Sequence, residues 1–179
     1  FVDGGDGTDT FTVNGDNSSE VFKILDVTQA IAQGFQPTYD NTEIVVVRND
    51  EIIAELDNIE ELVINTGVAG FGALAGGANT FNSGDTVEVA GTFDTTSLNY
   101  STIHVTGTEA HDTVDITGLT SAHRVVFDTR GGGDQVMGLH FLDQAGTYLV
   151  VDLDQCFTPV LRVGQFPENL AWPVWEGFQ

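Results

Sequence analysis

The chain has 179 residues, and its 27 Asp and Glu against 5 Lys and Arg give a formal net charge of −22. Such a surface repels phosphate groups, which excludes nucleic acid and anionic lipid head groups as partners. No apolar run is long enough to form a transmembrane helix. Hydrophobic residues still make up 41% of the chain, so the acidity does not indicate disorder.

The excess of acidic residues favours a surface that attracts cations, and bound divalent metal ions are the simplest way to neutralise this negative charge. A merely soluble, solvated acidic surface remains the alternative. Cys156 is the only cysteine, so no intramolecular disulfide can form, and we interpret it as a small buried hydrophobic residue. The N-terminal Phe1 follows neither an initiator Met nor a signal-peptide pattern, and we interpret the chain as a piece of a longer polypeptide.

Short runs of β-branched and aromatic residues, separated by Gly, Asn, Asp and Thr, predict strands throughout the chain. Most runs alternate apolar and polar residues, as in strands with one buried face. Strands are expected at residues 10–13, 20–25, 43–47, 61–64, 86–89, 102–105, 113–116 and 124–127. One or two helical turns are expected at 27–34, a hairpin turn at 48–51 and a turn that leads into a strand at 57–61.

An aspartate recurs two residues before an apolar residue that enters a strand, and it usually follows a glycine-containing turn. The four examples are Asp9, Asp85, Asp112 and Asp134. The last three are separated by 27 and 22 residues, and each interval holds two strands and one further turn. This pattern is typical of stacked coils whose strands pair in parallel. It predicts an all-β fold, a parallel β-roll or β-helix.

We expect one module over residues 1–179 with three irregular parts. Residues 26–57 do not fit a short coil and are expected to form an excursion. Residues 66–81 are rich in Gly and Ala and are expected to be a loop inserted in a turn. Residues 141–179, where the repeat has faded, are expected to cap the open end of the stack.

The segment Gly4–Thr12 satisfies every fixed position of the nonapeptide G-G-x-G-x-D-x-U-x, where U is apolar. The turn over residues 129–137 is a fair match, and the turns before Asp85 and Asp112 are degenerate. The chain therefore resembles the RTX (hemolysin-type) calcium-binding repeat family. Ca²⁺ takes six to eight oxygen ligands, which carboxylates and the carbonyls of glycine-rich turns can supply.

The resemblance implies that Ca²⁺ binds between stacked turns and is needed for folding. The residues that it implies as ligands, through carboxylates or nearby backbone carbonyls, are Gly4, Asp6, Gly7, Asp9, Gly84, Asp85, Gly107, Asp112, Gly131, Gly133 and Asp134.

The resemblance also implies a secreted bacterial protein exported by type I secretion. Residues 57–67 and 119–127 look like segments of repeat regions in large secreted bacterial proteins, some of which carry a haem-peroxidase domain elsewhere. The rest of a larger polypeptide is then a partner of this module. We expect no catalytic residue in the module itself, because nucleophile-elbow, phosphate-loop and zinc-site motifs are absent.

Two other functions stay open. An adhesin or carbohydrate-binding module would present the aromatic C-terminal tail or the 66–81 loop to cell-surface or glycan ligands. A polysaccharide-acting enzyme would need a carboxylate-lined groove along one coil face. The histidines form no metal motif; His104, His111 and His140 are expected on the surface or in turns, and His123 is expected to be a hydrogen-bonded core residue.

Overall fold

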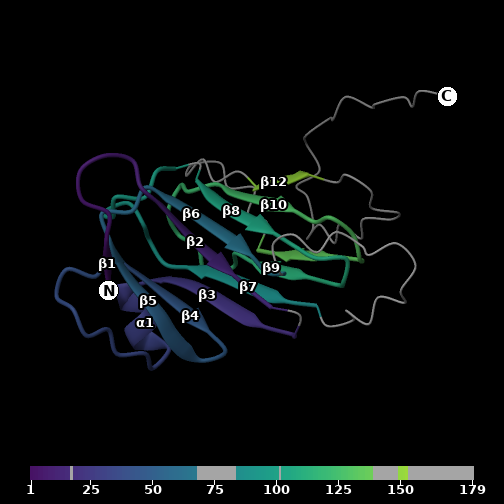
Figure 1. Ribbon diagram of the computed structural model, residues 1–179, viewed down its shortest axis with the longest axis horizontal. Helices are drawn as coiled ribbons and strands as arrows, with labels where there is room; N and C mark the ends of the chain where they lie inside the picture. Colours follow the sequence, from purple (N-terminus) through teal and green to yellow (C-terminus); the bar gives the residue numbers. More distant parts are fainter. Residues whose placement is uncertain (17, 68–83, 101, 139–148, 153–179) are drawn as a thin grey trace, which may run out of the picture.

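A computed structural model describes residues 1–16, 18–67, 84–100, 102–138 and 149–152 of the chain. The described part is all-β, with two sheets and one short helix, α1 (Val27–Ala32) (Figure 1). The strands, in chain order, are β1 (Val2–Asp3), β2 (Thr10–Asn14), β3 (Val21–Asp26), β4 (Ile44–Arg48), β5 (Glu51–Asp57), β6 (Glu61–Asn65), β7 (Thr86–Ala90), β8 (Ile103–Thr106), β9 (Thr113–Asp115), β10 (Val125–Asp128), β11 (Gln135–Met137) and β12 (Leu149–Asp152).

Successive strands alternate between the two sheets, except that β3, β4 and β5 all lie in sheet A. Sheet A has the order β1-β5-β4-β3-β7-β9-β11, and sheet B has the order β12-β10-β8-β6-β2. Along sheet B all neighbours are parallel, as are β3, β7, β9 and β11 in sheet A. We call one strand of sheet B with the strand of sheet A that follows it a level. The described levels are β2/β3, β6/β7, β8/β9 and β10/β11.

The main core lies between the two sheets, because alternate residues of each strand point inward. The registers place equivalent apolar residues in columns that cross the levels. In sheet B, Leu62 pairs with Ile103, which pairs with Val125, and all three are buried. In sheet A, Phe22 pairs with Val87, which pairs with Val114. The period-two pattern of the sequence therefore fixes which face of every strand is buried.

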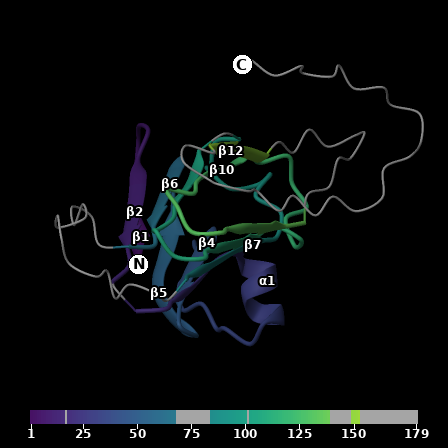
Figure 2. The ribbon, with the colours of Figure 1, turned by 90° about the vertical axis from the view of Figure 1, so that its right-hand side faces the viewer.

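Residues 26–57, where we predicted an excursion, contain α1 and the β4–β5 hairpin, and the hairpin widens sheet A at one end. Strands β4 and β5 make an antiparallel hairpin whose two turn residues, Asn49 and Asp50, have φ values of 51° and 65°. Asn and Asp tolerate this left-handed region better than most residues, which suits a two-residue hairpin turn. Helix α1 covers the outer face of sheet A and packs Ala30 into a second, smaller core (Figure 2).

Asp26 explains where α1 begins. Its side chain accepts a hydrogen bond from the backbone N–H of Gln29 and so caps the first turn of the helix. Gly34, at a φ of 95°, follows the last turn, where glycine commonly ends a helix. The helix has only six residues, so packing against sheet A must stabilise it.

The eight expected strands, the helical turn and the hairpin turn are all confirmed, with boundaries shifted by one or two residues. Four strands lie outside the eight expected ranges: β1, β5, β11 and β12. Of these, β5 completes the hairpin that the expected turn implies, and β11 follows Asp134 as the repeat implies. The two-residue β1 pairs in parallel with the end of β5, and β12 adds a further parallel strand to sheet B. No helix among the described residues is long and apolar enough to cross a membrane. Most of the expected loop at 66–81 lies outside the described residues, and so does nearly all of the expected cap at 141–179.

Close stacking of the levels predicts a sharp difference between two glycines. A Cβ atom on Gly84 would lie 1.6 Å from the carbonyl oxygen of His111 on the next level, whereas one on Gly133 would have its nearest neighbour, the His111 Nδ1, at 3.7 Å. We expect Gly84→Ala to lower the free energy of unfolding by about 3 kcal/mol or more, since the two turns must separate. Gly133→Ala is the matched control and should be nearly neutral in urea denaturation. Equal effects of the two substitutions would contradict the stacking described here.

Candidate functional site

Four acidic residues lie one above another at the turns that lead from sheet B to sheet A. The backbone N–H of Glu20 donates to Oδ1 of Asp85 at 2.8 Å, that of Asp85 donates to Oδ1 of Asp112 at 2.8 Å, and that of Asp112 donates to Oδ1 of Asp134 at 2.8 Å. Each residue immediately precedes a strand of sheet A. We call Glu20, Asp85, Asp112 and Asp134 the carboxylate ladder. It connects all four described levels through one repeated hydrogen bond.

The ladder is largely removed from water. Glu20, Asp85 and Asp112 are only 1%, 2% and 2% exposed. Burial raises the pKa of Asp85 to about 6, although the N–H of Glu20 favours its charged form; the charge on Asp112 adds to the increase. Burial likewise raises the pKa of Asp134 to about 6, again with a contribution from Asp112. The ladder therefore brings like charges together where water screens them poorly.

At the first level, the ladder ends at Glu20, whose carboxylate is paired with a cation. Arg48, from the excursion, forms ion pairs with both Glu20 and Asp16. The second oxygen of Glu20 accepts the backbone N–H of Asp16 at 2.7 Å. The hairpin thus supplies the positive charge that a fully buried Glu20 side chain requires.

Asp112 needs no further partner. Its Oδ1 accepts the N–H of Asp85, and its Oδ2 accepts the N–H of Thr108 at 2.5 Å and the hydroxyl of the same residue at 3.1 Å. Oδ1 of Asp85 accepts the N–H of Glu20, and the nearby hydroxyl of Thr66 lowers the pKa of this carboxyl. Both inner carboxylates therefore already accept donors from the protein itself.

Asp134, at the other end of the ladder, differs from the inner members. Its Oδ1 accepts the N–H of Asp112, but its Oδ2 is buried and has no hydrogen-bond partner among the described residues. Gly132 in the same turn has a φ of 89°, and its Cα lies so close to the carbonyl of Ala110 that a Cβ would sit 1.7 Å from that oxygen. This turn therefore combines an unsatisfied carboxylate oxygen with a closely packed backbone.

Asp9 does not join the ladder. It lies at a turn from sheet A to sheet B, and because the strands of sheet B are parallel, this turn is at the opposite edge of the stack (the purple loop at the left of Figure 1). Its backbone N–H donates to Glu60 on the next level at 2.8 Å. Its Oδ2, like that of Asp134, is buried and accepts no hydrogen bond from any described residue. Gly5 and Gly7 curl this turn with φ values of 80° and 136°.

The structure thus separates the sequence-predicted residues into two places. Gly4, Asp6, Gly7 and Asp9 share the first turn, in which Asp6 is exposed and Gly4 packs against the carbonyl of Asn58. The other predicted residues, Gly84, Asp85, Gly107, Asp112, Gly131, Gly133 and Asp134, lie at the ladder edge.

The oxygen donors would suit Ca²⁺ only at two turns, residues 4–9 with Asp9 and residues 131–134 with Asp134, which we call the outer turns. Among the described residues no group of three or more His, Cys, Asp or Glu side chains could hold a metal ion. The inner carboxylates already accept protein donors. Asp9 and Asp134 each keep one buried carboxylate oxygen free beside a glycine-rich turn, so a hard cation would take that oxygen, backbone carbonyls and water.

Sequence reasoning missed three acidic residues with structural roles. Glu20 continues the ladder, and Glu60 takes the N–H of Asp9; neither follows a glycine turn of the expected kind. Glu55 is 6% exposed; burial alone would raise its pKa, but hydrogen bonds from the backbone of Tyr39 and Thr38 and from the hydroxyl of Thr42 outweigh burial and lower it. Its position within an alternating strand offered no signal.

The histidine predictions can be checked in part. His123 is 1% exposed, and its ring nitrogens lie 2.9 Å from Oγ of Ser121 and 3.0 Å from the carbonyl of Leu98, so it is the hydrogen-bonded core residue expected. His104 and His111 are exposed, as expected. His140, Cys156 and the aromatic tail lie outside the described residues.

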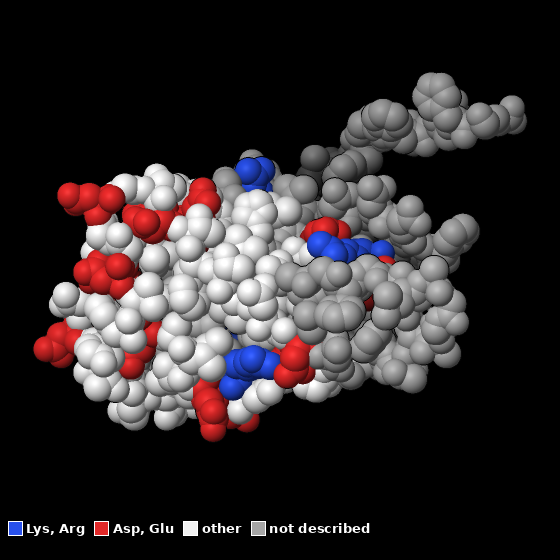
Figure 3. All heavy atoms as spheres, viewed as in Figure 1, with Lys and Arg blue, Asp and Glu red and all other residues white. Residues whose placement is uncertain are grey.

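Negative charge gathers at one end of the visible face. In Figure 3 most red carboxylate side chains cluster at the left, around the end of the molecule that carries β1 and the first turn, and blue side chains are few. A field of one sign raises the local concentration of counter-ions. The first turn therefore lies where cations collect.

No family model matches the chain, and no curated protein or solved structure is significantly similar to it. The function must therefore be argued from the geometry of the chain itself.

The raised pKa of Asp85 predicts a pH dependence of stability. The folded-state pKa of about 6 exceeds the ordinary value of 3.8, so the stabilisation is complete below about pH 4 and is lost as pH rises through 6. We expect Asp85→Asn, which keeps the acceptor for the N–H of Glu20, to remove up to roughly 3 kcal/mol of this dependence. Urea denaturation in EGTA between pH 4 and 7.5 measures it. The exposed Asp40 gives the control, Asp40→Asn; a wild-type slope retained in Asp85→Asn would refute the assignment.

Removal of the positive charge of Arg48 from the first level should destabilise the fold. Arg48→Met keeps apolar contact with Phe22, whose ring centroid lies 5.9 Å from the guanidinium carbon, but leaves Glu20 buried without its partner. We expect a loss of about 3 kcal/mol at pH 7.5. The double variant Glu20→Gln, Arg48→Met should recover most of this loss in thermal denaturation. A double variant no more stable than Arg48→Met would show that Arg48 acts through something other than the charge of Glu20.

Proposed function

We propose that this chain is a calcium-binding module of a secreted bacterial RTX-type protein, built as a parallel β-roll whose outer turns are completed by Ca²⁺. The observation that carries the proposal is the pair of unsatisfied buried oxygens, Asp9 Oδ2 and Asp134 Oδ2. They belong to the two turns that match the nonapeptide best. A buried carboxylate oxygen without a partner is costly, which favours a bound cation at both positions.

The alternation of strands between two parallel-stacked sheets supports the β-roll. Each level adds one strand to each sheet and one member to the columns of the core. In such a stack every level depends on its neighbours, so a ligand that joins adjacent turns stabilises the whole.

The residues of the outer turns perform separate tasks. The carboxylate of Asp9 would hold the ion with backbone carbonyls of residues 4–7, and that of Asp134 would hold it with carbonyls of residues 131–133. Gly5, Gly7 and Gly132 allow the backbone to curl there. A bound Ca²⁺ supplies two positive charges that neutralise carboxylates and link them to carbonyl oxygens.

The inner ladder limits how strongly folding depends on the ion. Asp85 and Asp112 are satisfied by N–H and hydroxyl donors, so their levels can stack without metal. Glu20 Oε1 also lacks a hydrogen bond but is paired with Arg48, so the buried carboxylate oxygens with neither kind of partner among the described residues are those of Asp9 and Asp134. We therefore propose that Ca²⁺ orders the ends of the stack and raises its stability. The free energy of Ca²⁺ binding then adds to the free energy of folding. The chain would stay loosely folded for export in the low Ca²⁺ of the cytosol and would fold in the high Ca²⁺ outside the cell.

A Ca²⁺ titration tests this function. After EGTA treatment, we expect Ca²⁺ but not Mg²⁺ to raise the melting temperature followed by circular dichroism. A Kd on the order of 10⁻⁴–10⁻³ M suits an extracellular module. Ca²⁺ at one hundred times Kd should add about 2.7 kcal/mol per site. Asp9→Asn and Asp134→Asn should each remove part of the increase.

Asp112→Asn is the matched control, because both oxygens of Asp112 already have protein donors. It should change stability in EGTA without changing the response to Ca²⁺. If Ca²⁺ leaves the melting temperature of the wild-type protein unchanged, the proposal is wrong and ordered water is the better partner for the two oxygens. If Asp112→Asn abolishes the response while Asp9→Asn does not, the ions lie elsewhere than we propose.

A further inference from the structure

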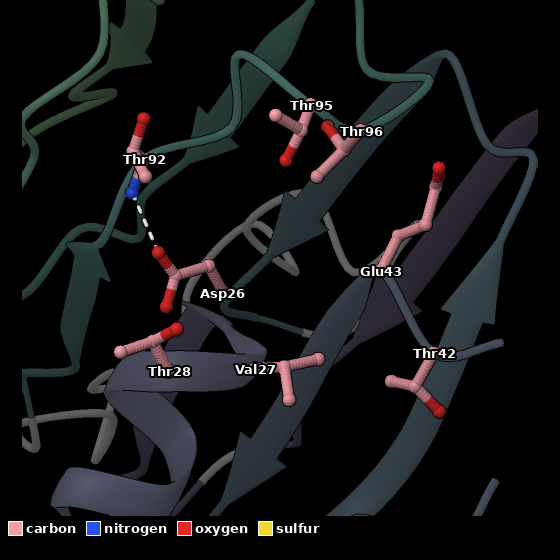
Figure 4. A pocket seen from close by; sticks show the side chains of 8 residues that line it. All are labelled: Asp26, Val27, Thr28, Thr42, Glu43, Thr92, Thr95 and Thr96. Carbon is pink, nitrogen blue, oxygen red and sulfur yellow. Dashed lines mark hydrogen bonds between the residues drawn. The ribbon is translucent and has the colours of Figure 1, made fainter. Parts of the chain in front are cut away.

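A small polar hollow lies at the edge of the stack where strands of sheet A lead into sheet B, and none of its lining residues is a proposed calcium ligand. It has a volume of about 240 Å³ and lies between the start of α1, the segment before β4 and the loop after β7 (Figure 4). Three segments far apart in sequence meet there. Five of its eight lining residues are threonines, two are acidic, and none is Lys or Arg.

The walls of the hollow are held in place by the acidic residues. Asp26 Oδ2 accepts the backbone N–H of Thr92 at 2.7 Å, which ties the loop to the start of α1. Glu43 Oε2 accepts the backbone N–H of Ser97 at 2.9 Å, which ties the other end of the same loop to β4. A site whose walls are fixed in advance loses little conformational entropy when a ligand binds.

Several polar groups remain available for a ligand. The hydroxyls of Thr28 and Thr95 have no hydrogen-bond partner among the described residues, and only one oxygen of Glu43 is engaged. In Figure 4, Thr95 and Thr96 lie across the hollow from Val27 and Thr28, with Glu43 at one side. The hollow thus offers hydroxyl groups that both donate and accept, one carboxylate oxygen that accepts, and an apolar surface from Val27 and the threonine methyl groups.

These groups select the chemistry of the ligand. An anion is repelled, because no cation lines the hollow and two carboxylates do. A metal ion would need converging carboxylate oxygens, but both oxygens of Asp26 are taken by the N–H groups of Gln29 and Thr92. A neutral polyhydroxyl compound matches hydroxyls, a carboxylate and small apolar patches. The volume is below the roughly 300–1,000 Å³ of pockets for drug-sized ligands, which limits the ligand to about one sugar ring.

We propose that this threonine-lined hollow binds a neutral monosaccharide unit, with the hydroxyls of Thr28 and Thr95 and the free oxygen of Glu43 bonding to sugar hydroxyls. None of its lining residues is a proposed calcium ligand, so the site can be tested with or without Ca²⁺. The lining residues also belong neither to the aromatic tail nor to the 66–81 loop, the segments considered above for glycan binding.

Amide NMR of the full chain tests the proposal, because the N–H groups of Thr92 and Ser97 hold the walls and report on occupancy. The probes are D-glucose, D-galactose, D-mannose and N-acetyl-D-glucosamine up to about 50 mM, well above a Kd of 1 mM. At least one should shift both amides in a saturable manner. D-glucuronate should bind more weakly than glucose, since its carboxylate meets the carboxylates of the hollow.

Thr95→Val removes an exposed hydroxyl without changing the size of the side chain, so the fold should be kept. It should weaken the saccharide response about fivefold to tenfold, since one hydrogen bond is lost. Thr12→Val, at an exposed position on β2, should leave the response unchanged. If no saccharide shifts the two amides, the monosaccharide site is wrong; a response unchanged by Thr95→Val would also overturn it.

Discussion

The fold depends on one repeated hydrogen bond, from the backbone N–H of a residue at the ladder edge to the buried carboxylate one level further on. Parallel strands pair through their backbones and set the register within each sheet. The ladder extends this register into the turns, because each carboxylate can accept its N–H only when neighbouring turns are aligned. The cost is a row of like charges in a poorly hydrated interior.

The protein meets this cost differently at each level. Arg48 neutralises Glu20 at one end, and hydroxyls of Thr66 and Thr108 support the inner aspartates. At the far end Asp134 keeps a carboxylate oxygen with no described partner. The same deficiency appears at Asp9 on the opposite edge. The two unsatisfied oxygens thus lie at the ends of the described rows, where no further described level supplies a donor.

Much of the fold could be predicted from the sequence, because strand positions follow from alternation of apolar and polar residues and from glycine-containing turns. The stacking of Asp85, Asp112 and Asp134 was visible in their equivalent positions before strands. The place of Asp9 was not, since the same local motif occurs at either edge of the stack. Glu20 and Glu55 were also beyond prediction, because their roles depend on partners 65 and 16–17 residues away that no local pattern reveals.

The short strand β1 has a consequence for self-association. A stack of parallel strands exposes unpaired backbone groups at its ends, and such edges recruit strands from other molecules into aggregates. At the N-terminal end of sheet A, β1 covers the edge of β5 only at Leu56 and Asp57. Sheet B finishes in β2, one of whose edges no described strand covers. The two residues of β1 therefore shield only the last part of β5, and the rest of this end keeps backbone groups with which another strand could pair.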